Sequence, residues 1–367
     1  MMLLKRKVQI SVIALFLIFL ANSVMSCTVP VFQYAMERWT QSYYHGVLLY
    51  SGNLSQEEKE TFASFHRMLK NNNSLLNLQV EKLNVESRPD QYKRLLKGAD
   101  PGNLPALALW YPRQKGQNKP FWIGDLQMSD LEKIGESSKR REITGHLIKG
   151  SPVVWLLVYP QGHDNKQVPL NSLQSGITKS VEAMKQRPQY KPLLGENGKE
   201  VSFPVVTLSA GSQKESVVLS MITGLRDGSS VKEPIVIPVF GRGRALTTFT
   251  ADKISEERIY NIMTFLMSPC ACQIKMASPG TDMLVQANWQ KAFDAYPQQN
   301  ASPTLTGVMP DSSSESTLTT ENDTIIDLTT DQQSSFIGSK IITSAGGIIG
   351  ILAIVIGIVT MIVLKRK

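Results

Sequence analysis

The sequence has few of the side chains that usually carry catalysis or bind metals. It contains three cysteines and four histidines in 367 residues. So few cysteines exclude a small domain held together by disulfides. The histidines, His45, His66, His146 and His163, lack the His-x-x-x-His spacing of a helical metal site. We therefore predict no metal site and no cofactor.

An excess of one charge sign is also missing from most of the chain. The formal net charge is +8, from 39 basic and 31 acidic residues. Seven basic residues flank two apolar runs near the ends, namely Lys5, Arg6, Lys7, Lys340, Lys365, Arg366 and Lys367. Without them, 32 basic residues face 31 acidic ones. The charge therefore indicates membrane topology and not nucleic-acid binding.

The first apolar run predicts a signal peptide over residues 1–26. Val8 to Leu20 form an apolar segment behind a basic one, and this segment is too short to span a membrane comfortably. Two interpretations of Val24-Met25-Ser26-Cys27 stay open. Ordinary cleavage after Ser26 leaves an unmodified Cys27. A partial resemblance to a bacterial lipobox, which lacks the usual leucine, favours lipidation of Cys27.

The second apolar run predicts a transmembrane helix over residues 341–364. These 24 residues carry no charge, and as a helix they rise about 36 Å, enough to span a membrane. The basic tail after Leu364 is predicted to stay on the cytoplasmic side, with the ectodomain outside. Residues 297–335 are rich in Ser, Thr and Asp and lack Lys and Arg, which predicts a flexible acidic stalk.

The globular part between the two runs is α/β and has the same order of elements twice. The expected elements are strand, helix, strand, helix, proline-entered strand, hairpin strand and helix. In the first half they are placed at 46–50, 55–69, 76–80, 90–97, 104–111, 119–123 and from 129. In the second half they are placed at 153–159, 173–184, 203–208, 215–225, 235–240, 245–249 and from 255.

This order of elements resembles the thioredoxin fold, present here as two tandem domains over residues 27–150 and 151–296. The resemblance implies a cis-proline before the third strand of each domain. That proline corresponds to Pro105 in the first domain and to Pro238 or Pro234 in the second. Proline at a strand end also occurs for ordinary steric reasons.

The resemblance places a redox centre, Cys-x-x-Cys, where the first strand meets the first helix, whose N-terminus lowers the thiol pKa. In this sequence those positions are residues 50–54, Tyr-Ser-Gly-Asn-Leu, and residues 159–163, Tyr-Pro-Gln-Gly-His. Neither segment contains cysteine. If the fold is right, both redox centres have been lost.

Two other short motifs deserve a chemical interpretation. Residues 241–244, Gly-Arg-Gly-Arg, lack the lysine and hydroxyl residue of a phosphate loop and lie between two strands, so we expect a basic hairpin turn. His163 and Asp164 are adjacent in a predicted loop. A solvated turn is the favoured interpretation, and a catalytic dyad is the alternative.

Cys270-Ala271-Cys272 is the most distinctive motif of the globular part. It follows the last helix behind Ser268-Pro269. Lipidation of Cys27 would leave two thiols, so we predict a disulfide between Cys270 and Cys272 in an oxidising compartment. Thiol–disulfide exchange and Cu(I) binding with nearby methionines are the alternatives.

The predicted function is that of a membrane-anchored interaction or scaffold protein without catalysis. Residues 27–39 also resemble the mature start of bacterial membrane-anchored proteins, which places the ectodomain on the periplasmic side. Its expected partners are the membrane and other envelope proteins. A eukaryotic type I membrane protein is the alternative, because Asn53, Asn72, Asn300 and Asn322 each begin an Asn-x-Ser/Thr sequence.

Overall fold

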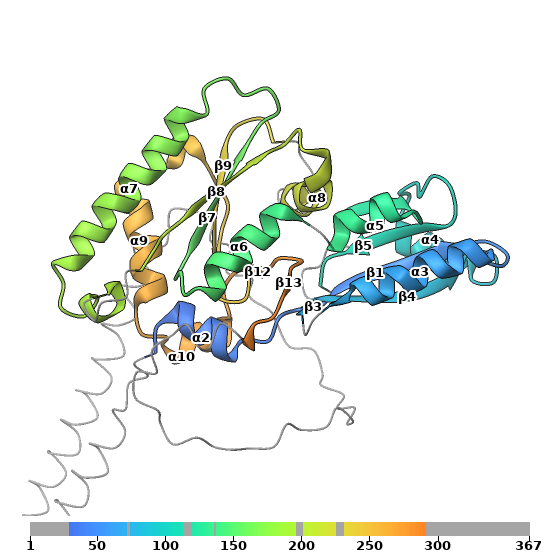
Figure 1. Ribbon diagram of the computed structural model, residues 1–367, viewed down its shortest axis with the longest axis horizontal. Helices are drawn as coiled ribbons and strands as arrows, with labels where there is room; N and C mark the ends of the chain where they lie inside the picture. The colour runs from blue at the N-terminus through green and yellow to red at the C-terminus, as the bar shows by residue number, and fades with distance from the viewer. Residues whose placement is uncertain are drawn as a thin grey trace, which may run out of the picture. The chain divides into compact units, whose positions relative to one another are not determined.

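The computed structural model describes residues 29–71, 74–112, 119–135, 137–195, 201–224 and 231–290, which contain both helices and strands (Figure 1). The predicted signal peptide (1–26), Cys27, the stalk (297–335) and the transmembrane segment (341–364) lie outside these ranges and stay predictions. Among the described residues, no helix combines the length and hydropathy needed to cross a bilayer.

The first repeat runs from residue 44 to residue 135 and contains the predicted order of seven elements. In chain order they are β1 (Tyr44–Tyr50), α3 (Gln56–Met68), β4 (Leu78–Asn84), α4 (Pro89–Leu96), β5 (Ala106–Trp110), β6 (Trp122–Asp125) and α5 (Met128–Gly135). The sheet order is β4-β1-β5-β6. Strand β1 pairs parallel with β4 and antiparallel with β5, because a helix connects the first pair.

The second repeat runs from residue 154 to residue 267 with the same order. Its elements are β7 (Val154–Tyr159), α7 (Gln167–Lys185), β8 (Val205–Ser209), α8 (Ser216–Gly224), β9 (Ile235–Phe240), a return strand split into β10 (Arg244–Ala245) and β11 (Phe249–Thr250), and α9 (Glu256–Met267). Strand β7 again lies between a parallel neighbour, β8, and an antiparallel neighbour, β9. The duplication expected from the sequence is therefore present in the topology.

Hydrogen bonds at the ends of the first strands repeat in detail. The carbonyl oxygen of Tyr50, the last residue of β1, accepts from the Val85 amide at 2.9 Å. The carbonyl oxygen of Tyr159, the last residue of β7, accepts from the Ala210 amide at 2.8 Å. These bonds continue the parallel pairing beyond each strand, so the strand–helix loops of the two repeats start from equivalent backbone positions.

Segments that are not among the seven elements of either repeat join the two repeats into one body. They are α2 (Val31–Arg38), β2 (Lys70–Asn71), β3 (Ser74–Leu76), α6 (Ser138–Ile148), α10 (Cys272–Ala277), β12 (Thr281–Asp282) and β13 (Gln286–Ala287). Strand β13, from beyond the second repeat, pairs with β3 inside the first. Helix α2, from before the first repeat, packs against α9 and β9 of the second. The predicted division at residue 150 therefore does not separate two independent bodies.

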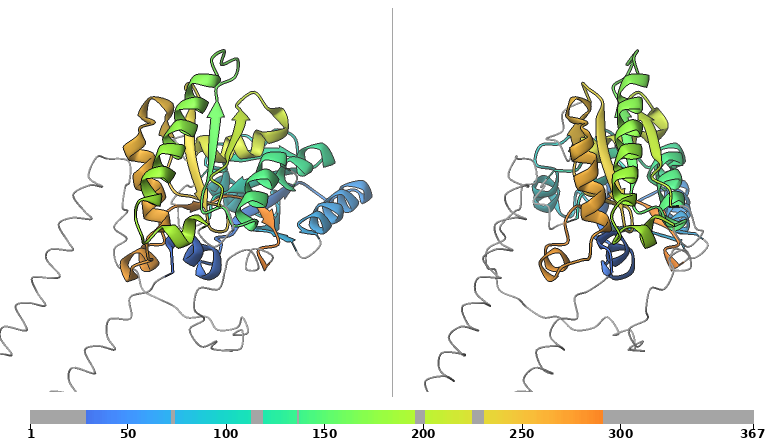
Figure 2. Two further views of the ribbon diagram at one scale, coloured as in Figure 1. Left: turned by 60° about the vertical axis from the view of Figure 1, so that its left-hand side comes forward. Right: turned by 90° about the vertical axis from the view of Figure 1, so that its left-hand side faces the viewer.

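One continuous hydrophobic core extends through both repeats and the segments that join them. In the second repeat, β7 and β9 are buried at every position, with α7 and α9 over one face of the sheet and α6 and α8 over the other (Figures 1 and 2). In the first repeat, α3 and α5 cover the face that belongs to this main core. The opposite face carries a separate cluster of six buried residues, Val47, Leu49, Leu83, Leu96, Ala108 and Trp110.

Candidate functional site

The loop after β1 occupies the position where the fold resemblance places a redox centre in the first repeat. Its side chains bind to the end of β4 and not to one another. The Ser51 hydroxyl donates to the Glu86 carboxylate, and the Gly52 amide donates to the same carboxylate at 3.3 Å. The side-chain amide of Asn84 donates to the Gly52 carbonyl at 2.9 Å. The loop is thus fixed by carboxylate and amide groups where a dithiol would lie.

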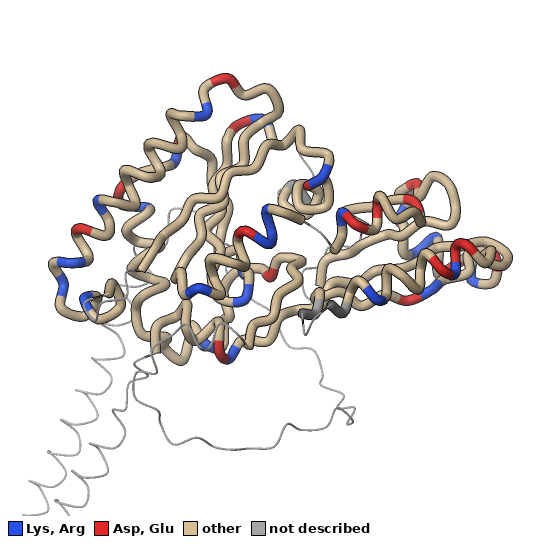
Figure 3. The backbone as a smooth tube through the Cα atoms, viewed as in Figure 1, with Lys and Arg blue, Asp and Glu red and all other residues tan. Residues whose placement is uncertain are grey.

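The N-terminus of α3, which follows this loop, is closed by a capping box. The Glu58 amide donates to the Ser55 hydroxyl at 3.2 Å, and the Ser55 amide donates to the Glu58 carboxylate at 2.7 Å. A helix N-terminus attracts negative charge, and here Glu57 and Glu58 supply it. Acidic residues are visible along α3 in Figure 3. This helix end is therefore not free to stabilise a thiolate or to bind an anion.

The proline opposite the end of the first strand differs between the repeats. The register of β1 with β5 and of β7 with β9 places Pro105 opposite Tyr50 and Pro234 opposite Tyr159. The Leu104–Pro105 bond is cis, as the fold resemblance implied. No cis bond precedes Pro234, nor Pro238, which was the other candidate. Pro238 lies inside β9 opposite Trp155, where the extended strand continues on both sides.

The loop after β7 in the second repeat is held by its backbone. The Tyr159 hydroxyl donates to the Lys166 carbonyl at 2.8 Å, and the His163 amide donates to the Pro160 carbonyl at 3.3 Å. The rings of Tyr159 and His163 stack with centroids 5.8 Å apart. His163 thus lies in a turn beside the exposed Asp164, as the favoured interpretation expected. Burial raises the pKa of Tyr159, which keeps its hydroxyl a donor.

Cys270 and Cys272 have different surroundings. The Cys270 side chain is fully buried, whereas Cys272 is exposed as the first residue of α10. No bond joins their sulfur atoms, so the predicted disulfide between them is not formed in the structure. The physical reason is that the chain turns from extended to helical at Cys272, which leaves one side chain in the core and the other in solvent.

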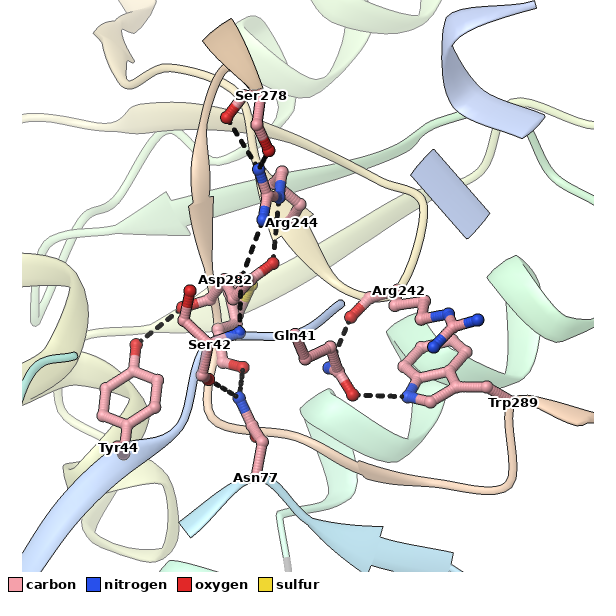
Figure 4. Close-up of polar contacts among 10 residues, drawn as sticks. Gln41, Ser42, Tyr44, Asn77, Arg242, Arg244, Ser278, Asp282 and Trp289 are labelled. Atoms are coloured by element: carbon pink, nitrogen blue, oxygen red, sulfur yellow. Dashed lines mark hydrogen bonds and ion pairs between the residues drawn. The ribbon is translucent and has the colours of Figure 1, made fainter. Parts of the chain in front are cut away.

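A network of buried polar groups, here called the polar junction, lies between the repeats (Figure 4). Its centre is Asp282 of β12, which accepts two bonds from Arg244 of β10, each 2.9 Å long. The same carboxylate accepts from the Ser42 amide at 2.8 Å, just before β1. Arg244 also donates to the Ser278 carbonyl at 2.7 Å and lies over the Trp39 ring. Both ions are buried, and their partners satisfy them.

Asn77 and Tyr44 extend the junction into the first repeat. The Asn77 side chain donates to the Ser42 carbonyl at 3.0 Å and to the Met283 carbonyl at 3.1 Å, and it accepts from the Val285 amide at 2.8 Å. The Tyr44 hydroxyl donates to the Asp282 carbonyl at 2.8 Å. Burial raises the pKa of Tyr44, and the nearby Tyr111 and Asp282 raise it further. The Tyr44 and Asn77 side chains are therefore each hydrogen-bonded to a residue that lies more than 200 positions later in the sequence.

The buried Arg140 of α6 makes a second connection. Its guanidinium donates to the Leu284 carbonyl at 2.7 Å and to the Lys133 carbonyl at 3.0 Å, at the end of α5. Glu215 accepts from the Ser138 hydroxyl at 2.9 Å and the Lys139 amide at 3.0 Å at the start of α6. Burial lowers the pKa of Arg140 to about 10, against the opposing effect of Glu215. Helix α6 is thus bound to both repeats.

The Gly-Arg-Gly-Arg segment forms the expected turn, but its arginines point inward. Gly241 and Gly243 have φ of +54° and +81°, and a Cβ on Gly241 would lie 2.7 Å from that of Ala35. Arg242 donates to the Met36 carbonyl at 2.6 Å, and Arg244 joins Asp282. Sequence reasoning missed this role, because Asp282 lies 38 residues from Arg244 with no local pattern between them.

The chemistry of these groups is structural. Asp282, Asn77 and Glu215 are hydrogen-bonded to protein groups on the oxygens that a substrate would need. Within the described ranges, no group of three or more His, Cys, Asp or Glu side chains is placed to hold a metal ion. The candidate site is therefore a hydrogen-bonded connection between two repeats, each with a strand–helix loop that is itself held by hydrogen bonds.

Comparisons with known proteins found matches among solved structures. No protein family matches the sequence, and no curated protein matches it. Solved structures that match include the zinc-bound form of human ERp44, at 11% identity over 64% of this chain and 57% of that one, with a TM-score of 0.21. The first two thioredoxin domains of Naumovozyma dairenensis Eps1p match at 16% identity over 64% of this chain and 96% of that one, with a TM-score of 0.18. Full-length ERdj5 matches at 9% identity over 68% of this chain and 33% of that one, with a TM-score of 0.21.

The chain spans little more than half of ERp44 and a third of ERdj5. With TM-scores of 0.18 to 0.21, these matches carry no argument about the fold or the function of this chain. None of the matches bears on the resemblance of residues 27–39 to bacterial membrane-anchored proteins. By its topology, the described part of the chain is a mixed α/β structure in which one order of elements, the order that resembles the thioredoxin fold, occurs twice.

Proposed function

We propose that this protein is a non-catalytic interaction or scaffold module, anchored to a membrane with its globular part outside the cytoplasm. The observation that supports the proposal is that the loops at both expected redox positions lack cysteine and are held by hydrogen bonds. In the first repeat, Ser51 and Gly52 are bound to Glu86, and Glu58 closes the helix N-terminus. In the second, the loop is a backbone turn held by Tyr159. Because neither loop contains a cysteine, neither has a thiol that could react. The protein can still bind partners through its surface.

The connections between the repeats support a scaffold. The polar junction and Arg140 bind the N-terminal segment, α6 and the 278–285 segment to one another. Two repeats fixed in this way present one constant surface to a partner, which lowers the entropy cost of binding. Lys, Arg, Asp and Glu are interspersed along most of the chain (Figure 3). Such a surface suits protein partners in an envelope or membrane complex better than a polyanion.

A turnover assay tests the absence of catalysis. Full-length protein is added to insulin with dithiothreitol or glutathione, and disulfide reduction is followed over time. We expect the uncatalysed rate with the wild type and with Cys272→Ser alike. Acceleration by the wild type that Cys272→Ser removes would overturn the proposal in favour of thiol–disulfide exchange.

The rival function has one observation in its favour. Cys272 is exposed and Cys270 lies buried two residues before it, so an attacking thiol and a resolving thiol would be close in sequence. Copper handling through the same pair is tested by Cu(I) competition against a coloured chelator. Equal retention of copper by wild type and Cys272→Ser is the result expected for a scaffold.

Accessibility to protease tests the proposed location. Protease added to intact spheroplasts should digest the region from residue 27 to residue 335 and leave the membrane-embedded C-terminal fragment. Full protection of the globular part would contradict the location. Chemical crosslinking in the same membranes, followed by purification of the tagged chain, should then recover a membrane partner in fixed proportion. Repeated recovery of the chain alone would contradict the scaffold role.

A further inference from the structure

The second sheet ends in a strand, β8, that has a neighbour on one side. In the order β12-β10-β9-β7-β8 it comes last, and within the described ranges no strand pairs with its other side. The Trp155 amide donates to the Pro204 carbonyl at 2.9 Å, and the Ala210 amide donates to the Tyr159 carbonyl at 2.8 Å. Successive residues of a strand direct their main-chain groups to opposite sides. The even-numbered positions from 204 to 210 therefore face β7, and the odd-numbered positions between them face away.

The outward main-chain groups of β8 are available for hydrogen bonds. In the part of the chain that the structure describes, the amides and carbonyls of Val205 and Thr207 have no hydrogen-bond partner. The Ser209 carbonyl accepts one bond, from the Ser212 amide at 3.0 Å. The side chains of Val205, Thr207 and Ser209 are half-buried, whereas the two residues between them are buried. The edge thus presents donors and acceptors beside a partly exposed row of side chains.

This edge also lacks the charges that usually protect an edge strand. Residues 201–213 contain no Lys, Arg, Asp or Glu. The equivalent edge strand of the first repeat, β4, carries the exposed Glu81 and Lys82. A lysine on an edge strand opposes pairing with another sheet. The edge of the first sheet therefore has this protection, and the edge formed by β8 does not.

The edge of β8 is complementary to a second copy of itself. In an antiparallel pair centred on Thr207, this residue lies opposite the same residue of the second copy, and Val205 lies opposite Ser209. All three positions face outward, so each opposed pair can exchange both N–H···O bonds. The two-fold axis of such a pair is perpendicular to the sheet, so the side chains of both copies lie on one face. A threonine–threonine pair is favourable there, and no like charges are opposed.

We propose that two copies of this chain associate through β8 and join their second sheets into one continuous sheet. The same five-residue strand serves in both copies, as in other two-fold symmetric interfaces. An extended segment of a different protein would use the same main-chain bonds. The second copy is the occupant that the symmetry about Thr207 and the absence of charge favour. This association goes beyond the proposed scaffold function and depends neither on the absence of catalysis nor on the location of the protein.

Introduced cysteines test the pairing. Full-length protein carrying Cys272→Ser, which removes the exposed thiol of α10, is purified in detergent and oxidised with copper phenanthroline. Thr207→Cys in this background should give a disulfide-linked dimer on non-reducing gels. The reason is that opposed Cα atoms lie about 5.5 Å apart, within the roughly 4.4 to 6.8 Å that a disulfide needs. Val80→Cys, at an outward-facing position of β4, is the matched control and should stay at the level of the background. Crosslinking of Thr207→Cys no faster than that of Val80→Cys would overturn the proposal.

A mixture of two further variants tests the register. Val205→Cys and Ser209→Cys, on chains with different tags, should crosslink to each other, because each position lies opposite the other in the proposed pair. Each variant alone should crosslink much more slowly than Thr207→Cys. Crosslinking of Val205→Cys to itself as fast as that of Thr207→Cys would overturn the antiparallel register.

A charged substitution tests the association without crosslinks. The wild-type full chain in detergent should sediment as a dimer, and Thr207→Lys should sediment as a monomer, because two lysines would be opposed. Val80→Lys on β4 should stay dimeric, and urea unfolding checks that each variant is folded. A wild type that is monomeric at every concentration, including one that instead binds another protein through this edge, would overturn the proposal. A dimer that catalyses the reduction of insulin would retain the association and reject the proposed non-catalytic function.

Discussion

The two repeats have the same backbone arrangement and different surroundings. Both place a central strand between a parallel and an antiparallel neighbour, and both continue the parallel pairing with one equivalent hydrogen bond after Tyr50 and Tyr159. Helices cover both faces of the second sheet, so β7 and β9 are buried throughout. The first sheet shares one face with the main core, and its other face carries the separate six-residue cluster, to which α4 contributes Leu96.

The difference shows which parts of a duplicated fold can change. Backbone pairing between strands is set by register and does not depend on the side chains of the strand–helix loops. The strand–helix loops lie outside this pairing, and the two repeats hold them by different contacts. Ser51 and Glu86 hold the first loop, and a turn beneath Tyr159 holds the second.

The largest expected effect comes from breaking the polar junction that ties the repeats together. Asp282→Asn leaves the buried Arg244 guanidinium without its counter-charge and weakens the bond to the Ser42 amide. Breaking a buried pair by removing one partner costs about 3 to 5 kcal/mol. Urea unfolding of the full chain should show this loss in free energy of unfolding.

A matched control for this substitution is the exposed ion pair of Lys179 and Glu256, which joins α7 to α9 within one repeat. Lys179→Ala should cost less than about 1 kcal/mol, because exposed pairs contribute little. If Asp282→Asn cost no more than Lys179→Ala, the junction would not hold the repeats together, and their rigid display to a partner would lose its support.

A second comparison measures the unequal burial of the two sheets. Leu156 in β7 and Leu49 in β1 are both fully buried on central strands. Leu156 belongs to the main core, whereas Leu49 belongs to the six-residue cluster. Leucine-to-alanine changes in cores cost about 2 to 5 kcal/mol, and the cost is smaller where the site can collapse. We expect Leu156→Ala near the upper end and Leu49→Ala near the lower end in urea unfolding.

The exposed Val168 of α7 provides the control for these truncations, since Val168→Ala should change stability by less than about 0.5 kcal/mol. Equal costs for Leu49→Ala and Leu156→Ala would show that the smaller cluster is packed as firmly as the main core. The difference between the repeats would then be one of size alone.

Local patterns predicted much of this fold, and long-range pairings were beyond them. Ser55 and Ser255 were expected to start helices and do so, because a helix cap depends on residues three positions away. Helix α7 begins at Gln167 and not near Leu173, since its first turn has no capping side chain to mark it. Helix α6 was not expected, because its buried face includes the charged Arg140 and therefore does not show the apolar spacing of a typical helix.

The elements that join the repeats were missed for similar reasons, with one exception. Helix α2 places Val31, Phe32, Ala35 and Met36 in the core, and this spacing of apolar residues was present in the sequence. The Arg244–Asp282 pair had no such signal. Charged residues are exposed by default, and only the folded chain shows which two meet in the interior.

A third prediction concerns alkaline pH and the two buried tyrosines of the first repeat. Burial raises the pKa of Tyr44 and of Tyr111, so both stay protonated when folded and lose protons above about pH 10 when unfolded. The contribution of each tyrosine to the free energy of unfolding is fully present below pH 10. It decreases as the pH rises, by up to about 1.4 kcal/mol per pH unit. Arg140, with its pKa lowered to about 10, acts in the opposite direction between about pH 10 and 12.5.

The two tyrosines lower the free energy of unfolding as the pH rises above about 10, and Arg140 opposes part of this loss. Tyr111→Phe removes the contribution of one tyrosine and should make the fall in the free energy of unfolding less steep, whatever it costs at neutral pH by losing the bond to the Met221 carbonyl. Urea midpoints between pH 9 and pH 11.5 measure it, and an unchanged slope in the variant would contradict the assignment.

The smallest expected effect tests how the two strand–helix loops are held. Ser55 caps α3 with its hydroxyl, and Ser55→Ala should cost about 1 kcal/mol in urea unfolding. Lys166 occupies the same position before α7, but its backbone is helical and its side chain makes no cap. The bond from Tyr159 goes to the Lys166 carbonyl, which alanine keeps. Lys166→Ala should therefore change stability by less than about 0.5 kcal/mol. A cost for Lys166→Ala as large as that for Ser55→Ala would show that side chains fix both loops alike.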